Sequence, residues 1–282
     1  MELSRRGFLA GAAALGACRL LGGRVRREPL LLDTKRMAIH DGPGIRTTFF
    51  VKGCPLKCIW CHNPEAISPE RQVARFRHLC RHCAKCTGDE ATCPTRALKV
   101  YGRSATIDEL VAKALEDRQF YEASGGGVTL SGGEPLFFWE WAYDFLAACK
   151  REGLHTCLDT SLYAPPAAVE RLLEVVDMWL PDFKAADAAV HERYTGVSNL
   201  VIKRNLERLV AAKAKLEVRC LVVPGCTEDM PARYAYLDSI GIDRKAVVEL
   251  EYFDYARSKY EALGLEDTMP PRPAADAVRA QE

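Results

Sequence analysis

Short apolar, β-branched runs alternate with amphipathic segments between residues 47 and 253, and this alternation limits the fold more than any other feature of the sequence. Neighbouring parallel strands need long crossover connections, which are usually helices that cover the sheet. The six predicted strands are residues 47–53, 127–135, 155–160, 177–184, 216–225 and 246–253. The sequence therefore predicts an α/β fold, a partial (β/α)6 TIM-like barrel.

Helical spacing of apolar residues predicts helices over 136–151, 166–176, 199–213 and 230–239. A further helix fits residues 106–123, because Thr106 and Glu109 have the capping-box spacing in which each side chain satisfies an exposed backbone N–H. The stretch 78–100 contains few periodic apolar residues and four cysteines. We interpret it as a small ferredoxin-like iron–sulfur insert between the first strand and this helix.

Composition excludes several classes of protein. The chain has 282 residues, of which 48% are hydrophobic, enough to bury a full core. Its 39 basic and 38 acidic side chains nearly cancel, which gives no general attraction to nucleic acid. The 12 cysteines are about 4% of the residues, below the roughly 8–10% of disulfide-built secreted scaffolds. The cysteines are therefore interpreted by their spacing.

The two ends differ from the body, which spans residues 28–265. Residues 1–27 contain Arg5 and Arg6 before an apolar run that ends at Cys18, which is too short to span a bilayer of about 20 helical residues. This segment predicts either a twin-arginine export signal or a disordered extension, and no stable membrane span. Residues 266–282 are rich in proline and alanine and predict a loose tail.

The first cysteine group is Cys54, Cys58 and Cys61, directly after the strand 47–53. Three thiolates in a short loop can hold three irons of a four-iron, four-sulfur (4Fe–4S) cluster and leave the fourth iron open for chemistry. A chance grouping, or a zinc site completed by His62, are the alternatives.

The second group lies in the insert and consists of Cys80, Cys83, Cys86 and Cys93. Its spacing resembles a bacterial ferredoxin run, except that the last gap is six residues rather than three. We expect one 4Fe–4S cluster here, as an electron relay or a structural support. A zinc ion with four cysteine ligands is the alternative, because thiolate spacing alone does not select the metal.

Longer sequence strings resemble a known family. The pattern C-x3-C-x-W-C is the cluster motif of the radical S-adenosylmethionine (SAM) superfamily. The strings IHDGPGIRTTFFVKGCPLKCIWCHNPE and YEASGGGVTLSGGEPLF resemble the activating enzymes of glycyl-radical enzymes, such as the pyruvate formate-lyase activating enzyme. Shorter matches, among them LPDFK at 180–184 and SKYEALG at 258–264, extend the resemblance over about residues 28–265.

The resemblance implies a cofactor site. Cys54, Cys58 and Cys61 would hold a 4Fe–4S cluster whose open iron binds the amino and carboxylate groups of SAM. The segment that approaches the SAM amino group would be Gly132, Gly133 and Glu134, since glycines admit close backbone approach and a carboxylate suits an ammonium. Trp60 and His62 match positions beside the bound cofactor.

Further matching residues lie at the carboxyl ends of the predicted strands 155–160 and 177–184, at the face where barrel active sites collect. They are Asp159, Thr160, Asp182, Phe183 and Lys184. Three of them, Asp159, Thr160 and Asp182, match a monovalent-cation site near the cofactor carboxylate. Arg219 matches an arginine near the cofactor, with a structural ion pair as the alternative.

The resemblance implies reductive cleavage of SAM to a 5′-deoxyadenosyl radical, which takes a hydrogen atom from a glycine of a partner glycyl-radical enzyme. Asp41 and Arg46 would contact the glycine loop of that partner at the lateral opening of the barrel. A flavodoxin or ferredoxin-type protein would donate the electron. An oxygen-sensitive radical generator belongs beside a cytoplasmic partner, although residues 4–18 leave export open.

Some positions depart from the family pattern. Phe253 stands where relatives carry a histidine, Leu180 stands where some carry methionine, and the chain beyond Gly264 is short. A phenyl ring cannot replace an imidazole hydrogen bond. Two alternatives therefore stay open: a radical SAM enzyme with another substrate, and an exported iron–sulfur electron carrier without radical activity.

Overall fold

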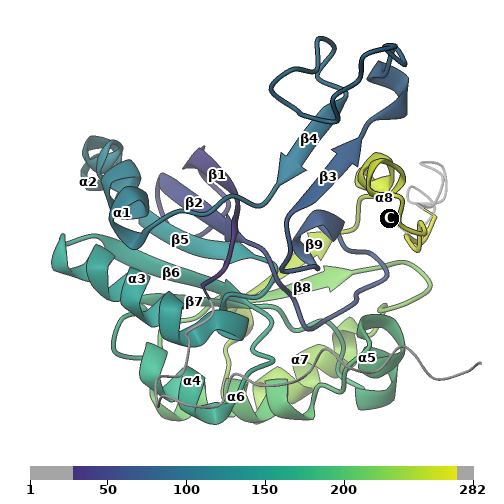
Figure 1. Cartoon of the computed structure of the whole chain (residues 1–282). Coiled ribbons are helices and arrows are strands. Elements are labelled where there is room, and N and C mark those ends of the chain that lie inside the picture. Colours follow the sequence, from purple (N-terminus) through teal and green to yellow (C-terminus); the bar gives the residue numbers. More distant parts are fainter. Residues whose placement is uncertain (1–27, 272–282) are drawn as a thin grey trace, which may run out of the picture.

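The main sheet of the computed structural model, which describes residues 28–271, has the strand order β1-β2-β5-β6-β7 (Figure 1). Its strands are β1 (Leu31–Ala38), β2 (Arg46–Val51), β5 (Gly127–Gly132), β6 (His155–Thr160) and β7 (Met178–Pro181). Strands β2, β5, β6 and β7 are parallel, and β1 pairs antiparallel with β2 at the edge.

Strands β8 (Val218–Val222) and β9 (Val247–Glu251) form a parallel pair that continues this sheet. Isolated parallel bridges join Trp179 to Leu216 and Asp182 to Arg219. All six predicted strands are thus present, in the order β2-β5-β6-β7-β8-β9. Among residues 28–271 no pairing joins β9 back to β1 or β2, so the predicted partial barrel is confirmed as an open one.

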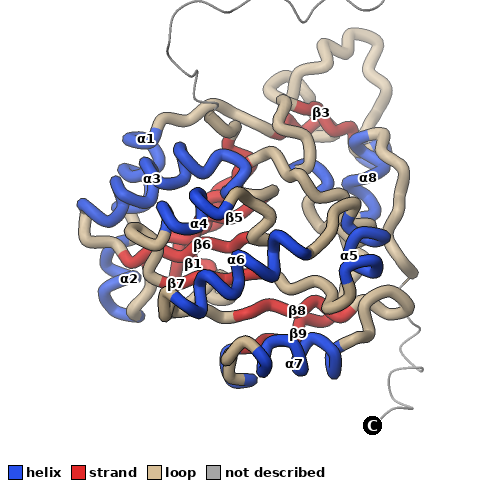
Figure 2. The backbone as a smooth tube through the Cα atoms, turned by 90° about the horizontal axis from the view of Figure 1, so that it is seen from below, coloured by secondary structure: helices blue, strands red, loops and turns tan. Residues whose placement is uncertain are grey.

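Helices cover the outer face of the sheet (Figure 2). They are α3 (Trp139–Arg151), α4 (Pro166–Leu172), α6 (Leu200–Ala211) and α7 (Met230–Ser239), each within or close to its predicted range. The 3-10 turns η3 (Pro135–Phe138) and η4 (Arg244–Ala246) flank them. The sequence did not indicate β1, α5 (Ala188–Thr195) or α8 (Arg257–Leu263).

The helix predicted over residues 106–123 is wrong in one respect, because it breaks into α1 (Ile107–Leu115) and α2 (Arg118–Ser124). The capping box of Thr106 and Glu109 is present as expected. The break falls at Asp117, whose carboxylate accepts hydrogen bonds from the Arg36 guanidinium and from Thr47 Oγ1, at 2.7 Å. These tertiary bonds to β1 and β2 outweigh the helical periodicity.

Alternation along the strands separates an apolar outer face from a polar interior. Phe49 on β2 packs edge-on against Phe145 of α3, with ring centroids 5.4 Å apart, within the main core. The neighbouring positions Thr48, Thr129 and Ser131 are also buried, yet they point toward the barrel interior, where their hydroxyls bond to other polar groups. Successive strand residues face opposite sides, so the interior is built for polar chemistry.

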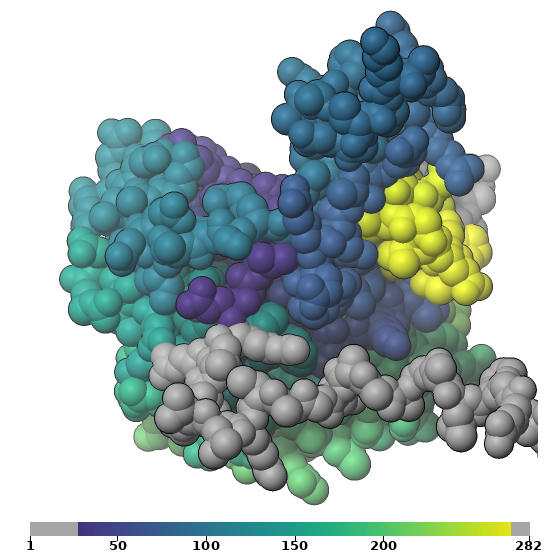
Figure 3. Space-filling model, in the orientation of Figure 1, coloured from purple at the N-terminus to yellow at the C-terminus, as the bar shows by residue number. Residues whose placement is uncertain are grey.

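The cysteine-rich insert is a hairpin of β3 (Gln72–Arg75) and β4 (Leu98–Tyr101), with the turn η2 (Arg77–Leu79) and the cysteine loop between them. It stands clear of the barrel in Figures 1 and 3. At its base Ala74 and Tyr101 pack against Ala262 of α8.

The expectation of a loose tail from residue 266 is wrong for its first six residues. Thr268 Oγ1 donates to Ile59 O at 2.9 Å, Tyr252 Oη donates to Pro270 O at 2.7 Å, and Met269 is buried. The predicted export signal or extension at 1–27 and the rest of the tail lie outside the described residues. Within residues 28–271, no helix is both long and apolar enough to cross a membrane.

Candidate active site

A cavity of about 490 Å³ opens at the carboxyl ends of the barrel strands. It is bordered by the ends of β5, β6, β8 and β9 and by the residues that follow β2 and β7. Most of the predicted site residues line it: Cys54, Cys58, Trp60, Cys61, His62, Gly132, Gly133, Asp159, Thr160, Asp182 and Lys184. Topology therefore brings together residues that are spread over some 130 positions of the sequence, because parallel strands end at one edge.

The three thiols of Cys54, Cys58 and Cys61 lie on one wall of this cavity. Burial is the main reason that their pKa values rise, to about 12 for Cys61. Thiols in this environment stay protonated unless a metal supplies positive charge, and a coordinating metal deprotonates a thiol outright. Within residues 28–271, no three His, Cys, Asp or Glu side chains converge closely enough to hold a single metal ion. Three partly buried thiols on one wall of a cavity fit a cluster with one open iron.

Backbone hydrogen bonds shape the cysteine loop from both sides. Gly53 N donates to Ala66 O at 2.7 Å, and Cys54 N donates to Ile67 O at 3.0 Å, which closes the loop on the turn η1 (Pro64–Ala66). The carboxyl end of α5 supplies the carbonyls of Tyr194 and Thr195, which accept from Ile59 N and Lys57 N. Sequence reasoning missed this role of α5, although Tyr194 and Thr195 begin YTGVSN at 194–199, another of the short strings that resemble the family.

Helix α8 holds the same loop from behind. Lys259 Nζ donates to His62 O at 2.9 Å, to Asn63 Oδ1 at 3.1 Å and to Glu65 Oε1 at 2.6 Å. Tyr260 Oη donates to Cys61 O at 3.1 Å. The string SKYEALG supported the family resemblance, but sequence reasoning assigned no role to Lys259 or Tyr260.

The turn after β5 requires glycine at two positions. Gly132 has φ +120°, and a Cβ there would meet Val51 N at 2.3 Å. At Gly133 a Cβ would lie 2.4 Å from Gly53 O. Since backbone atoms cannot move aside cheaply, only glycine lets the turn pack directly against the start of the cysteine loop. Both glycines border the cavity, as the sequence predicted.

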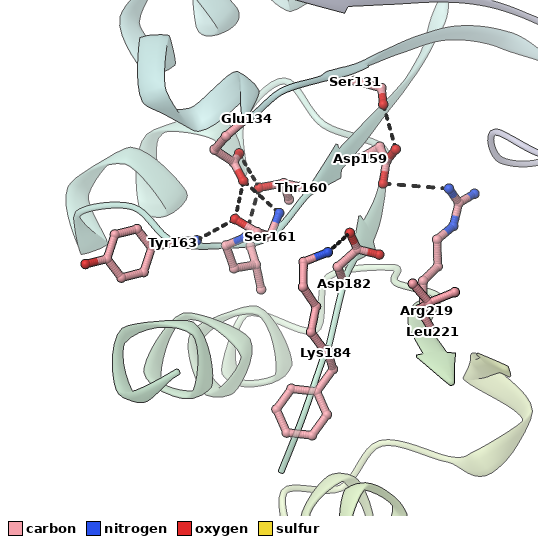
Figure 4. Close-up of polar contacts among 12 residues, drawn as sticks. Ser131, Glu134, Asp159, Thr160, Ser161, Tyr163, Asp182, Lys184, Arg219 and Leu221 are labelled. Carbon is pink, nitrogen blue, oxygen red and sulfur yellow. Dashed lines mark hydrogen bonds and ion pairs between the residues drawn. The ribbon is translucent and has the colours of Figure 1, made fainter. Parts of the chain in front are cut away.

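The expectation that the Glu134 carboxylate faces an ammonium in the cavity is wrong. It is fully buried beside the cavity and accepts hydrogen bonds from Leu136 N, Thr160 Oγ1, Ser161 N and Ser161 Oγ (Figure 4). Burial raises its pKa, although these four donors oppose that shift. Glu134 thus ties the end of β5 to the end of β6 and caps η3. Of the segment 132–134, only Gly132 and Gly133 border the cavity.

Two pairs of opposite charges line the interior (Figure 4). Lys184 Nζ donates to Asp182 Oδ2 at 2.6 Å, and an Arg219 nitrogen lies 3.7 Å from Asp159, which also accepts from Ser131 Oγ at 2.6 Å. Burial opposes the charge on Lys184, but the attraction of Asp182 outweighs it and raises the pKa of the ammonium. Burial raises the pKa of Asp159 despite the opposing pull of Arg219. The ion pair expected as the alternative role of Arg219 is present.

Aromatic residues form the other walls. The buried Trp60 lines the cavity and packs at 6.1 Å from the Tyr194 ring, and Phe253 lines it and stacks on Tyr255 at 5.2 Å. His62 Nε2 is hydrogen-bonded to Phe253 O, so the cysteine loop meets the segment after β9. Phe183 does not border the cavity, which contradicts its predicted contact with the cofactor. Its ring is buried on the outer side and stacks on Tyr236 of α7 at 5.2 Å.

Arg46 is also placed differently from the prediction. It is fully buried at the amino end of β2, and its guanidinium donates to Pro43 O at 2.9 Å, to Thr129 Oγ1 at 2.7 Å and to Val128 O. It therefore braces the segment 40–46 from inside and cannot contact a partner loop. Asp41 is partly exposed and accepts from Thr48 Oγ1 at 2.8 Å.

In the insert, the four cysteines Cys80, Cys83, Cys86 and Cys93 line one small cavity of about 50 Å³. Backbone hydrogen bonds, first of all from Leu98, lower the pKa of the Cys93 thiol. The loop thus places all four cysteines on the lining of one small space.

Comparisons with known proteins agree with this geometry. The radical SAM superfamily matches residues 48–235 of the chain. The (2S)-3-sulfopropanediol dehydratase activating enzyme of Klebsiella oxytoca is 36% identical over 84% of this chain and 86% of its own length. The choline trimethylamine-lyase activating enzyme of Oleidesulfovibrio alaskensis is 36% identical over 91% of this chain and 95% of its own length. The pyruvate formate-lyase 2-activating enzyme of Escherichia coli is 34% identical over 93% of this chain and 90% of its own length.

Among solved structures, SuiB of Streptococcus suis aligns with a TM-score of 0.53 at 13% identity, over 81% of this chain and 42% of SuiB, which shows a similar fold. The open barrel and the three-cysteine loop define a radical SAM protein, a class whose members bind a 4Fe–4S cluster and SAM. Within that superfamily the chain belongs to the glycyl-radical enzyme activating enzymes. These relatives support the activating function and neither alternative.

Proposed function

We propose that this protein activates a glycyl-radical enzyme by removing a hydrogen atom from one glycine of that partner. One observation carries the proposal: the three thiols, the glycine turn and the pair of Lys184 with Asp182 all border a single cavity at the carboxyl ends of the strands, and so does Asp159, which pairs with Arg219. When bound, the cluster supplies one electron that cleaves SAM and so provides the radical for this hydrogen transfer.

The residues of the chain have separate tasks in this activity. Cys54, Cys58 and Cys61 hold the cluster, and the backbone at Gly132 and Gly133 leaves room for the methionine end of SAM. Lys184 and Arg219 place positive charge beside the cavity, held in position by Asp182 and Asp159. These groups are already oriented before a ligand binds, so binding costs little reorganisation.

The apolar walls have a protective task. Trp60 and Phe253 present rings to the cavity and exclude water from one side of it. Exclusion of water prevents side reactions of a reactive species. Asp41, the remaining candidate for contact with the partner loop, keeps that role in the proposal, with Arg46 as its internal support.

The cation proposed at Asp159, Thr160 and Asp182 fits these residues less well. Asp182 pairs with Lys184, Asp159 pairs with Arg219, and Thr160 Oγ1 donates to Glu134 at 2.6 Å. A cation would have to displace Lys184 from its carboxylate. A comparison of SAM cleavage in potassium and in tetramethylammonium chloride tests this site, and equal rates reject it.

For the insert we propose a second 4Fe–4S cluster at Cys80, Cys83, Cys86 and Cys93, with a flavodoxin or ferredoxin-type protein as electron donor. The shared cavity of the four thiols supports this assignment. Iron and sulfide counts in a triple Ala variant of Cys54, Cys58 and Cys61 test it, because only insert-bound iron remains. Zinc without iron in that variant would reject the second cluster.

The activity itself is tested by anaerobic reconstitution with iron and sulfide, followed by SAM and dithionite. We expect 5′-deoxyadenosine, and a glycine-centred doublet in electron paramagnetic resonance (EPR) only when the partner enzyme is present. The triple cysteine variant is the control and gives neither product. Absence of 5′-deoxyadenosine from the reconstituted wild type overturns the proposed function. We also propose a cytoplasmic location, which a processed N-terminus in a periplasmic fraction would contradict.

A further inference from the structure

The cysteine-rich insert carries a charge opposite to that of the rest of the described protein. Residues 71–99 contain seven Lys and Arg against two acidic residues, a net charge of +5. The remaining described residues, 28–70 and 100–271, contain 24 basic and 33 acidic residues, a net charge of −9. The near-zero net charge of the whole chain therefore conceals a strong separation of positive charge in the insert from negative charge in the rest of the described protein.

All seven basic side chains of the insert are exposed: Arg71, Arg75, Arg77, Arg81, Lys85, Arg96 and Lys99. Within residues 28–271, none of these seven side chains forms an ion pair with a carboxylate. Most Lys and Arg side chains on the helices do form such a pair. Glu90, one of the two acidic residues, uses its carboxylate to accept from Val100 N at 2.8 Å. The positive charge of the insert is thus directed at solvent.

An open hollow of about 630 Å³ lies at the base of the insert, where the hairpin faces α8. Its apolar part comes from Phe76, Leu79 and Leu98. Arg96 and Lys99 supply positive charge at its border, against a single carboxylate on the lining, that of Glu90. Leu79 is 42% exposed and directly precedes Cys80, so the hollow adjoins the cysteine loop. An apolar floor with a cationic border suits a protein partner with an acidic surface.

We propose that the insert is the docking surface for a small acidic electron-carrier protein, which contacts the hollow and the basic side chains around it. The inference rests on the proposed function, since the cysteine loop beside the hollow is what favours an electron carrier over other acidic partners. The insert projects from the barrel in Figures 1 and 3, and no residue that borders the hollow also borders the cavity of the barrel.

The test uses the full, reconstituted protein and a purified acidic bacterial flavodoxin as the probe. The variant Arg77→Glu/Arg96→Glu/Lys99→Glu reverses two charges on the lining of the hollow and one next to it, at Arg77 of the turn η2. A matched control, Arg204→Glu/Lys215→Glu/Lys245→Glu, makes the same change of net charge at three exposed cations elsewhere. Circular dichroism and iron content confirm that each variant folds and retains its iron.

We expect the insert variant to bind flavodoxin about tenfold or more weakly at low salt, because a charged surface raises association rates by about 10–1,000-fold. The control should stay within about threefold of wild type. Affinity of the wild type should fall as salt rises, and that of the insert variant should change much less. Equal losses in both variants, or none in the insert variant, overturn the inference.

Two further measurements separate this inference from the proposed function. Dithionite is a small reductant that needs no docking surface, so SAM cleavage driven by dithionite should be the same in wild type and insert variant. If wild type fails with dithionite, the proposed function is wrong. If the insert variant keeps its flavodoxin affinity but no longer forms the glycyl radical under dithionite, the surface binds the glycyl-radical enzyme instead and the docking inference is wrong.

Discussion

Lys259→Met should destabilise the protein and loosen the cysteine loop, because Lys259 is the counter-ion of a buried carboxylate. Glu65 is 4% exposed, its Oε1 lies 2.6 Å from Lys259 Nζ, and its Oε2 has no hydrogen-bond partner among the described residues. The variant removes the ion-pair partner of this buried carboxylate and leaves Lys52, which donates to Glu65 O, as the nearby cation. It also removes the bonds to His62 O and Asn63 Oδ1 just after Cys61.

The size of the effect follows from burial. Loss of one partner of a buried ion pair costs about 3–5 kcal/mol. The Lys259 side chain is 31% exposed, so water recovers part of that cost, and we expect a loss of about 2–3 kcal/mol. The double variant Lys259→Met/Glu65→Gln should regain at least half of it, because the uncompensated charge is gone.

The assay is urea unfolding of the apoprotein followed by circular dichroism, with the rate of iron loss to a chelator as a second readout on the reconstituted protein. Lys113→Met is the matched control, because its pair with Glu116 is exposed on both sides and should be worth at most about 1 kcal/mol. A Lys259→Met protein as stable as that control, or a double variant no more stable than the single one, would refute this account of the loop.

Three further substitutions test other parts of the structure. The hydrogen bond from Arg36 lowers the pKa of Asp117 in the folded protein. The ionised carboxylate therefore stabilises the fold above the unfolded pKa of about 3.9, and this stabilisation is lost as pH falls through the lower folded pKa. Asp117→Asn should make the free energy of unfolding of the apoprotein depend less on pH in this acidic range. Glu134→Gln should cost about 2–3 kcal/mol in urea unfolding, since a buried amide then faces N–H and O–H donors, yet change SAM affinity by calorimetry less than about threefold. Gly133→Ala forces a Cβ to within 2.4 Å of Gly53 O, and the displaced turn should lower 5′-deoxyadenosine formation about 100-fold in a chromatographic assay.

Strands β2, β5, β6 and β7 were predictable because they are largely buried on both faces and leave apolar or β-branched runs in the sequence. Strand β1 was not, since it is an edge strand whose burial is confined to Leu31 and Ala38 at its two ends. The break at Asp117 also escaped prediction. It depends on Arg36 and Thr47, which are distant in sequence, and local periodicity carries no information about them.

Side-chain direction explains the errors within the site. Asp182 and Lys184 border the cavity while Phe183 between them packs outward, which is the alternation that any strand or its extension imposes. Arg46 could have been excluded in the same way. It begins β2 while the cysteine loop follows the end of that strand, so about five residues at 3.3 Å each, or about 17 Å, separate the two. The family resemblance identified the residues, and strand geometry decides which of them can act together.

Helix α8 connects the two cysteine groups more directly than the sequence indicates. One part of it packs on the insert, through Ala262 against Ala74, while Lys259 and Tyr260 hold the loop of the first group. A second connection comes from Lys52, which is buried, donates to Gln72 of β3 at 2.9 Å and to Glu65 O, and has its pKa lowered to about 8 by burial. Both connections converge on the segment after Cys61. The position of the insert is therefore tied to the shape of the cavity wall.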